Sequence, residues 1–548
     1  MKKIIALLLV IAMAFGLAAC GSGGTTESTG AVSGGDSGNV STGNQDSSKP
    51  TMITIGCKNT ITSLAPFVSP NPFINLILGD VYMHLAERVQ VGDSEMTGCL
   101  AKSWTQVDGK TYEFELYDYI TDSAGNPFTA SDVKFCFEQA VMGGIAAANY
   151  VDSVEVTDDT HFTLRLTTDS VGTLEQVCEN VFMVTQASYE ASVDGMATMP
   201  VSTGPYVVID YVAGSYVVIQ KSETFWQTEK LTPASYQANI DVIRFDILTE
   251  NTQMQGALQG DTVQAAFQVN SNLVPIFQAD NRYETSANPG GTFRYLVFNQ
   301  MEGSPFHDNL ALREAICYAI DAEGINVACS NGLDTVPANV GTSIYTGYND
   351  NWNSDLNNYY AYNKEKAEAL LAEAGYAPGE LTIRLGVNSL SSVQSYFEMI
   401  ATQLSDIGIN TEIVIYESTA YGEKQLSVTA DEWDIILGYS ITSIYQINQW
   451  SAQLDNDVFA HGMTQGGVND PELQALVDAC QSPDWTQAEL DELYQYLMDN
   501  CLSYHFLDNN NYHVANTGIS ELYTVGSSLV WRVGSFTLSD NWNYFYKG

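Results

Sequence analysis

The sequence has few basic residues. Its 548 residues include 21 Lys and Arg against 65 Asp and Glu, which gives a formal net charge of −44 and a pI near 4.1. Nucleic-acid binding depends on cations that neutralise phosphates, and an anionic bilayer surface repels a chain of this charge. The composition therefore argues against a nucleic-acid partner and against direct adsorption to a bare membrane.

Motifs of common enzymes and metal sites are also missing. There is no CxxC, no Gly-x-Ser-x-Gly, no His-Glu-x-x-His and no Gly-x-x-x-x-Gly-Lys. The six histidines are scattered, and no His, Cys or Met constellation stands out. We therefore expect no enzyme activity, no cofactor and no metal. The many carboxylates leave a two-carboxylate glycosidase as the open catalytic alternative.

The N-terminus has the pattern of an export signal. Lys2 and Lys3 precede an apolar run over 4–15, which is shorter than the roughly 20 residues that span a bilayer and fits a signal peptide. Leu17-Ala18-Ala19-Cys20-Gly21 resembles the bacterial lipobox, in which the cysteine is acylated. Residues 21–50 are Gly, Ser, Thr, Asp and Asn with few other residues, typical of a flexible tether. We predict a signal peptide over 1–20 and a lipid anchor at Cys20.

The first half of the remaining chain reads mainly as strands. The alternation of apolar residues predicts strands over 51–56, 112–117 and 161–166, and a hairpin over 206–220 that turns at Ala213-Gly214. One helix is predicted after Thr129, which with Asp132 makes a capping box.

The second half alternates helices and strands. A helix is predicted after Asp308, and another over 364–374 between a cap at Asn363 and a stop at Gly375. Three strands then alternate with two helices, in the order 381–387, helix 392–406, 411–416, helix 419–430 and 433–439. This order predicts a parallel, doubly wound sheet, with ligands near the carboxyl ends of its strands.

The cysteines give no disulfide pattern. Cys136 and Cys317 fall within apolar helical patterns and are predicted to be buried. Connectivity cannot be derived from the sequence, so the pairing of the eight cysteines after Cys20 stays open.

Four blocks of the sequence together carry a family resemblance. In chain order they are Leu100–Trp104 with Gly109–Phe114 and Phe128–Phe135; Thr203–Tyr206 with Gly214 and Phe225-Trp226; Phe298-Asn299 with Pro305-Phe306, Asp308, Arg313, Ala315 and Tyr318–Asp321; and Lys366-Ala367 with Glu373–Tyr376 and Leu404 to Ile409. This arrangement resembles family 5 extracellular solute-binding proteins, which serve ABC importers for oligopeptides, dipeptides and nickel.

The resemblance implies an α/β fold of the periplasmic-binding-protein-like type II (cluster C) class, with two lobes, a hinge and a domain inserted in the first lobe. Mapped onto this chain, lobe I is 51–88, 203–295 and 515–548, the inserted domain is 89–202, and lobe II is 296–514. Hinge crossings are expected near 296–300 and 510–515. The cleft between the lobes is expected to close on the ligand.

The expected ligand site departs from the family in one respect. Peptide-binding members often hold the α-amino group with an aspartate that corresponds to Thr442 or Ser443 here, and no charged residue occurs between Ile435 and Leu454. Hydroxyls, amides and rings in this region suit a neutral polar ligand. The candidate ligand-binding residues are Thr60, Phe293, Tyr295, Asn388, Tyr416, Tyr439, Thr442, Tyr445 and Trp450.

These observations predict a monomeric solute-binding lipoprotein on the outer face of the cytoplasmic membrane. It would deliver a small ligand, an oligopeptide in the first instance, to the permease and ATPase of an ABC importer. Two alternatives stay open: an oligosaccharide-binding member of the same family, and a surface sensor that is not coupled to transport.

Overall fold

The structure is a computed structural model. It describes residues 51–68, 72–88, 95–227, 236–355, 359–389, 391–438, 445–459, 461–520, 522, 524–525 and 530–539. The signal peptide, Cys20 and the tether predicted for 1–50, and the candidate residues Tyr439 and Thr442, lie outside these ranges.

A ten-stranded mixed sheet runs through the folded body, which is a two-lobed α/β structure of the predicted class. Its strand order is β14-β13-β15-β12-β16-β11-β1-β10-β9-β8. The strands are β1 (Met52–Cys57), β8 (Tyr206–Val212), β9 (Tyr216–Lys221), β10 (Val242–Ile247), β11 (Ala265–Val269), β12 (Tyr283–Phe298), β13 (Thr382–Asn388), β14 (Asn410–Tyr416), β15 (Ile435–Leu437) and β16 (Ser503–Asn516).

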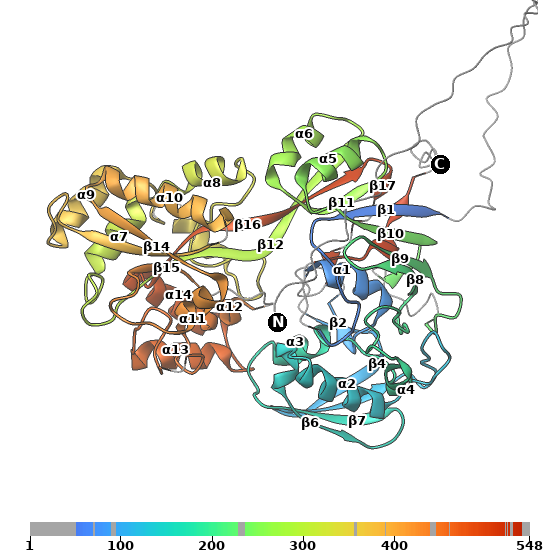
Figure 1. Cartoon of the computed structure of the whole chain (residues 1–548). Helices are drawn as coiled ribbons and strands as arrows, with labels where there is room; N and C mark the ends of the chain where they lie inside the picture. Colours follow the sequence, from blue (N-terminus) through green and yellow to red (C-terminus); the bar gives the residue numbers. More distant parts are fainter. Residues whose placement is uncertain are drawn as a thin grey trace, which may run out of the picture. The chain divides into compact units, whose positions relative to one another are not determined.

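Two long strands, β12 and β16, link the two lobes. They pair antiparallel from Tyr283↔Asn516 to Val297↔Ser503 and run side by side between the lobes (Figure 1). Their register shifts between Pro289 and Thr292, where β12 contains an Asn-Pro-Gly-Gly segment. Proline and glycine weaken a strand interior, so this point is where the ladder is locally disrupted. The lobe boundaries and hinge positions given above stay predictions.

The lobe I part of the sheet confirms the local sequence predictions. β1 pairs parallel with β10 and β11, and β8 and β9 form the predicted hairpin. Gly214 at its turn has φ +71°, a backbone conformation that glycine adopts without steric cost. Helix α1 (Pro72–Val81) packs against β8 and the C-terminal strand β19 (Val530–Trp531).

The part of the chain predicted to be the inserted domain, a name kept below, contains a separate four-stranded antiparallel sheet. Its order is β4-β5-β7-β6, formed by β4 (Ala101–Asp108), β5 (Thr111–Leu116), β6 (Val151–Val156) and β7 (His161–Leu166). Helix α2 (Ala130–Met142) begins at the predicted Thr129–Asp132 capping box. Helices α3 (Thr173–Glu179) and α4 (Gln186–Ala191) follow.

Lobe II confirms the doubly wound prediction for three strands. β13 pairs parallel with β14 and β15, whereas β15 pairs antiparallel with β12. Helix α9 (Lys364–Glu373) is capped by Asn363 as predicted. The cap of α7 (Leu310–Ala319) is Asn309, whose side chain accepts a hydrogen bond from the Leu312 backbone. The prediction of Asp308 as this cap was wrong by one position. Asp and Asn are both common N-cap residues, so the sequence did not distinguish between the two neighbours.

The predicted strand over 433–439 is shorter in the structure, where β15 covers Ile435–Leu437. The predicted helix over 419–430 is α11 and ends at Leu426. The remaining elements are α5 (Asn251–Gln259), α6 (Val274–Gln278), α8 (Ala322–Ser330), α10 (Ser391–Asp406), α11 (Ser418–Leu426), α12 (Gln446–Leu454), α13 (Pro471–Gln481), α14 (Gln487–Asn500), β2 (Ala86–Glu87), β3 (Thr97–Gly98), β17 (Ile519–Ser520), β18 (Thr524–Val525) and β20 (Thr537–Leu538).

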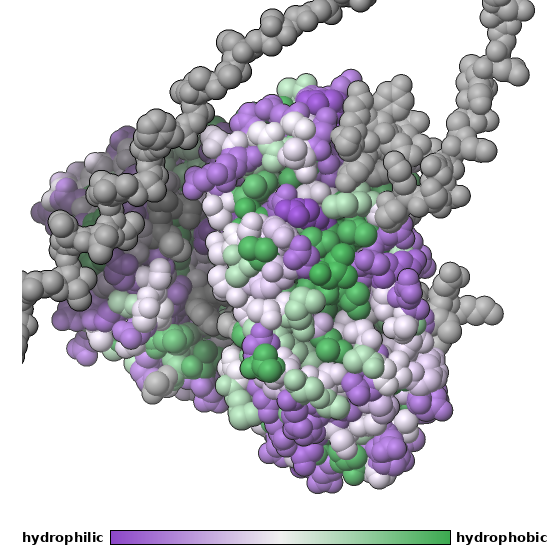
Figure 2. All heavy atoms as spheres, turned by 45° about the vertical axis from the view of Figure 1, so that its right-hand side comes forward, coloured by the Kyte–Doolittle hydropathy of each residue, from purple (hydrophilic) through white to green (hydrophobic). Residues whose placement is uncertain are grey.

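The surface mixes polar and apolar side chains. Figure 2 shows hydrophobic patches interspersed with hydrophilic regions on the side that faces right in Figure 1. Apolar atoms make up much of any folded protein's surface, so this pattern assigns no docking site. Within the described residues, every helix is too short or too polar to cross a membrane.

Candidate functional site

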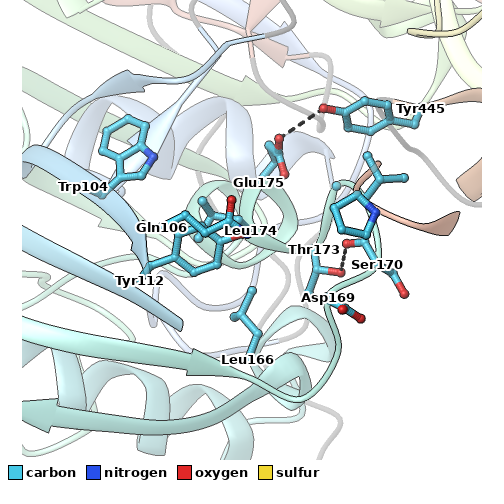
Figure 3. Close-up of a pocket in the computed structure, with 13 residues that line it drawn as sticks. Trp104, Gln106, Tyr112, Leu166, Asp169, Ser170, Thr173, Leu174, Glu175 and Tyr445 are labelled. Atoms are coloured by element: carbon cyan, nitrogen blue, oxygen red, sulfur yellow. Dashed lines mark hydrogen bonds between the residues drawn. The ribbon is translucent and has the colours of Figure 1, made fainter. Parts of the chain in front are cut away.

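A pocket of about 340 Å³ lies where the inserted domain meets lobe II. We call it the junction pocket (Figure 3). It is lined by Trp104, Gln106, Tyr112, Leu166, Asp169, Ser170, Val171, Gly172, Thr173, Leu174, Glu175, Tyr445 and Pro483. The last two residues come from lobe II and the others from the inserted domain.

The strands β4 and β5 place three of these side chains on one face of the small sheet. Trp104 and Gln106 are two residues apart on β4, so they share a face. Gln106 pairs with Tyr112 on β5, and residues paired across an antiparallel ladder project to the same side. Together they form one wall of the pocket, made of two aromatic rings and one side-chain amide.

The loop before α3 forms the opposite wall. Gly172 has φ +81°, and a Cβ there would lie 3.0 Å from Cδ2 of Tyr445. Both facts favour glycine, because an L side chain rarely adopts this backbone conformation and would also press on the Tyr445 ring. Thr173 donates a hydrogen bond to the Ser170 carbonyl at 2.6 Å, which fixes the loop at the pocket edge.

Three hydrogen bonds join this loop and α3 to lobe II. The Val171 backbone N–H donates to the Gln481 carbonyl at 2.9 Å. The side-chain amide of Asn448 donates to the Val171 carbonyl at 3.1 Å. The Tyr445 hydroxyl donates to Oε1 of Glu175 at 3.3 Å, as the dashed line in Figure 3 marks. The shape of the pocket therefore depends on how the inserted domain packs against lobe II.

The pocket carries negative charge and aromatic rings. Asp169 and Glu175 are among its thirteen lining residues, none of which is Lys, Arg or His. The guanidinium of Arg88, a cation near Glu175, donates to the Glu179 carboxylate at 2.9 and 3.1 Å, and the Arg88 backbone amide donates to it at 2.8 Å. A partly desolvated carboxylate next to aromatic faces attracts a cation, both by charge and through the ring quadrupoles.

Burial affects the ionisation of this site. It raises the pKa of Glu175 above the ordinary value, and the charge of Glu179 acts in the same direction, against the Tyr445 hydroxyl and Arg88. Burial also raises the pKa of Tyr112 to about 12 and that of Tyr445 further above its ordinary value. Both hydroxyls are therefore protonated at neutral pH and can donate hydrogen bonds.

Of the residues predicted for ligand binding, Tyr445 lines the junction pocket. Asn388 and Tyr416 are partners in the register of β13 and β14, so the structure brings them together at the strand ends. The Tyr416 hydroxyl donates to the Glu432 carbonyl at 2.9 Å. Thr60 is exposed in the loop after β1.

The other described candidates are core residues in this structure. Phe293 and Tyr295 are 3% and 1% exposed, and Trp450 is 2% exposed. The Tyr295 ring stacks on His505 at 4.3 Å, and Nε1 of Trp450 donates to the Val340 carbonyl at 3.2 Å. Their roles in ligand binding, like those of Tyr439 and Thr442, stay predictions.

Sequence reasoning missed Trp104, Asp169 and Glu175 as candidate contacts. For Trp104 the available signal was a large aromatic residue within a mostly polar strand, since β4 reads AKSWTQVD. Among the described residues, no group of three or more His, Cys, Asp or Glu side chains is placed so that it could hold a metal ion.

The sequence matches the family described as bacterial extracellular solute-binding proteins, family 5 Middle, over residues 95–456. The chain belongs to this family. Among curated relatives, it is 26% identical over 377 residues to heme-binding protein A of Haemophilus influenzae, covering 63% of this chain and 66% of that protein. It is 22% identical over 377 residues to the glutathione-binding protein GsiB of Pectobacterium atrosepticum, covering 68% of this chain and 70% of that protein.

Solved structures confirm the fold. HbpA2 from Haemophilus parasuis superposes with a TM-score of 0.75 at 18% identity, covering 89% of this chain and all of that chain. The matched region spans slightly less than two thirds of the heme-binding relative's length. The relatives are named as binding proteins rather than as enzymes, which supports a binding role for this chain.

Proposed function

We propose that this protein captures an oligopeptide outside the cytoplasmic membrane and presents it to an ABC importer. The observation that carries the ligand class is the junction pocket, in which two carboxylates and three aromatic rings line a space without a cationic side chain. A free peptide has an α-ammonium group and neutral amides, which match this lining.

The pocket supplies a chemical answer to the missing aspartate. A desolvated ammonium group needs a negative partner, and the segment after β15 has none. Glu175 and Asp169 provide that charge from the inserted domain. The GsiB relative is named for glutathione, a tripeptide, which supports a short peptide as the ligand.

Native mass spectrometry of residues 51–548 tests the ligand class. The purified protein is mixed with equimolar trialanine, glutathione and maltotriose, and the mass of each complex is compared with that of the denatured chain. We expect peptide adducts that fragment as amino-acid residues. A maltotriose adduct without a peptide adduct would instead favour the oligosaccharide receptor.

Coupling to transport needs a separate measurement in cells. Deletion of the gene is expected to abolish uptake of the peptide that the purified protein retains. Normal uptake together with a lost cellular response to that peptide would identify a sensor instead.

The lipid anchor gives the first mutational prediction. Cys20→Ser is expected to release the protein from the membrane fraction, because the serine hydroxyl cannot carry the thioether lipid of a lipoprotein and the tether buries no apolar surface. Fractionation and immunoblotting measure the distribution. Cys329→Ser is the matched control and should stay with the membrane; membrane retention of Cys20→Ser would contradict lipid anchoring.

A further inference from the structure

Two cysteines that are far apart in sequence meet inside lobe II. The Sγ atoms of Cys317 and Cys501 are 3.5 Å apart, and the two residues are 0% and 1% exposed. Cys317 lies on α7, and Cys501 caps the C-terminus of α14, two residues before the start of the linking strand β16. The contact therefore joins a helix of lobe II to the root of a strand that runs to the other lobe.

Arg313 holds these two segments in fixed relation. It lies one helical turn before Cys317 on α7, on the same face. Its guanidinium donates to the carbonyls of Asn500 at 2.9 Å and Cys501 at 3.2 Å. It also donates to the Phe306 carbonyl at 3.0 Å. The buried Arg313 guanidinium therefore holds the end of α14 against α7, where the two sulfur atoms lie close together.

The other cysteines provide an internal comparison. Sγ of Cys136 contacts the backbone of Val184, and Sγ of Cys99 faces the Tyr236 hydroxyl and the Thr97 carbonyl. Both residues are buried. Burial alone therefore does not bring cysteines together in this chain, whereas the α7–α14 contact does.

We propose that Cys317 and Cys501 form an intramolecular disulfide in the exported protein. A disulfide bond is about 2.05 Å long, so the sulfur atoms must approach by about 1.5 Å. Disulfides persist in oxidising compartments outside the cytoplasm, where this family of extracellular proteins acts. The inference is independent of the ligand proposed above.

The oxidant is a disulfide, either of an exported thiol oxidoreductase or of a small molecule such as oxidised glutathione. The thiolate of one of the two cysteines attacks one sulfur of the oxidant, forms a mixed disulfide and releases one thiolate. The thiolate of the other cysteine then attacks the Sγ atom of the first and releases the second thiolate. Two protons leave the cysteines, and their two electrons reduce the oxidant. Because both thiols are sealed in the native core, the reaction takes place before lobe II is fully packed.

Peptide mapping of the exported wild-type protein tests the proposal without any variant. The protein is alkylated in denaturant without reductant, digested and analysed by mass spectrometry. We expect a cross-linked peptide containing Cys317 and Cys501, two hydrogen masses lighter than the sum of the free peptides and lost after reduction. Full alkylation of both residues, to the extent seen for Cys57 and Cys136, would overturn the proposal.

Thermal unfolding gives a second readout. Protein refolded with oxidised glutathione should melt roughly 5 °C or more above protein refolded with reductant, since the cross-link closes a long loop in the unfolded chain. Cys317→Ser and Cys501→Ser should each abolish this difference, and Cys329→Ser should retain it. Equal melting temperatures of the two wild-type preparations, with both thiols alkylated, would overturn the disulfide as well.

Discussion

Replacing Arg532 by methionine is expected to lower the free energy of unfolding by about 3–5 kcal/mol, because it leaves a buried carboxylate without its cation. Arg532 is 2% exposed and Glu87 is 1% exposed. Nη2 of Arg532 donates to Oε2 of Glu87 at 2.8 Å and to the Tyr236 hydroxyl at 3.3 Å. Urea unfolding at pH 7 measures the change.

The pair has matched controls. Arg165→Met removes an arginine whose side chain is 53% exposed and whose ion pair with Asp152 spans 3.8 Å, so its effect should stay within about 0.5 kcal/mol. The double variant R532M/E87Q should be more stable than R532M alone, since it removes the orphaned charge. A loss as small for R532M as for R165M would contradict a tight buried ion pair.

The same substitution should change the pH dependence of stability. Arg532 and His84 outweigh the effect of burial and lower the pKa of Glu87 from its ordinary 4.5 to about 2. The stability contributed by this carboxylate is therefore present above pH 4.5 and is lost as pH falls toward 2. In R532M the carboxyl can protonate at a higher pH, so the difference between wild type and variant should narrow from pH 7 to pH 3. A constant difference would show that Glu87 does not titrate in this way.

The pKa of Asp80, which also interacts with Arg532, is shifted in the opposite direction. Burial raises its pKa from 3.8 to about 6, against the attraction of Arg532. Its contribution is fully present below pH 3.8 and is lost as pH rises through 6. The Gly534 amide donates to its carboxylate at 3.2 Å, so this titration bears on the C-terminal segment. Asp80→Asn separates the two effects. It should remove the decline in stability between pH 4 and pH 6 and leave the loss of stability at lower pH that comes from Glu87.

Replacing Glu175 by glutamine is expected to weaken binding of a free peptide about tenfold or more. A hydrogen bond to a charged group contributes about 1.5–3 kcal/mol, and glutamine keeps the shape of the side chain while it removes the charge. Isothermal titration calorimetry with the tripeptide retained in native mass spectrometry measures the affinity. Glu113→Gln is the matched control, because Glu113 follows Tyr112 on β5, projects to the opposite face and is exposed.

Acetylation of the peptide separates the role of the ammonium group from a general loss of packing. The wild type should bind the N-acetylated tripeptide about as weakly as Glu175→Gln binds the free one, and acetylation should have little further effect on the variant. Wild-type affinity should also fall as pH decreases through the raised pKa of Glu175, since a cation binds the ionised carboxylate. Equal affinity of wild type and variant for the free peptide would remove Glu175 from the site while leaving peptide capture itself intact.

The local signals in the sequence were sufficient for most helices and strands. Thr129 with Asp132 and Asn363 with Gly375 begin or end helices through contacts between residues a few positions apart, and the structure has both arrangements. The hairpin at Gly214 is of the same kind. The cap of α7 moved by one position because Asp308 and Asn309 offer the same chemistry to the helix, and packing determines which of them points at the first turn.

The contacts of the candidate site could not be predicted from local signals. Tyr445 could be assigned from a polar and aromatic segment, but its partner Glu175 is 270 residues away. Trp104 and Tyr112 come from a hairpin that carries part of the family resemblance, and neither residue was among the predicted ligand contacts. No periodic pattern reports which face of β4 meets the loop at Gly172, because that contact depends on how the inserted domain packs against lobe II.

The sequence by itself determined the family, the α/β class, the polarity of the surface and the positions of the main elements, since these depend on composition, local periodicity and capping between neighbours. Only the tertiary structure decided that Glu175 meets Tyr445, that Cys317 meets Cys501 and that Arg532 neutralises Glu87. Each of these pairs joins residues separated by 184 to 445 positions. Their chemistry exists only once the surrounding core removes water and holds the partners within contact distance.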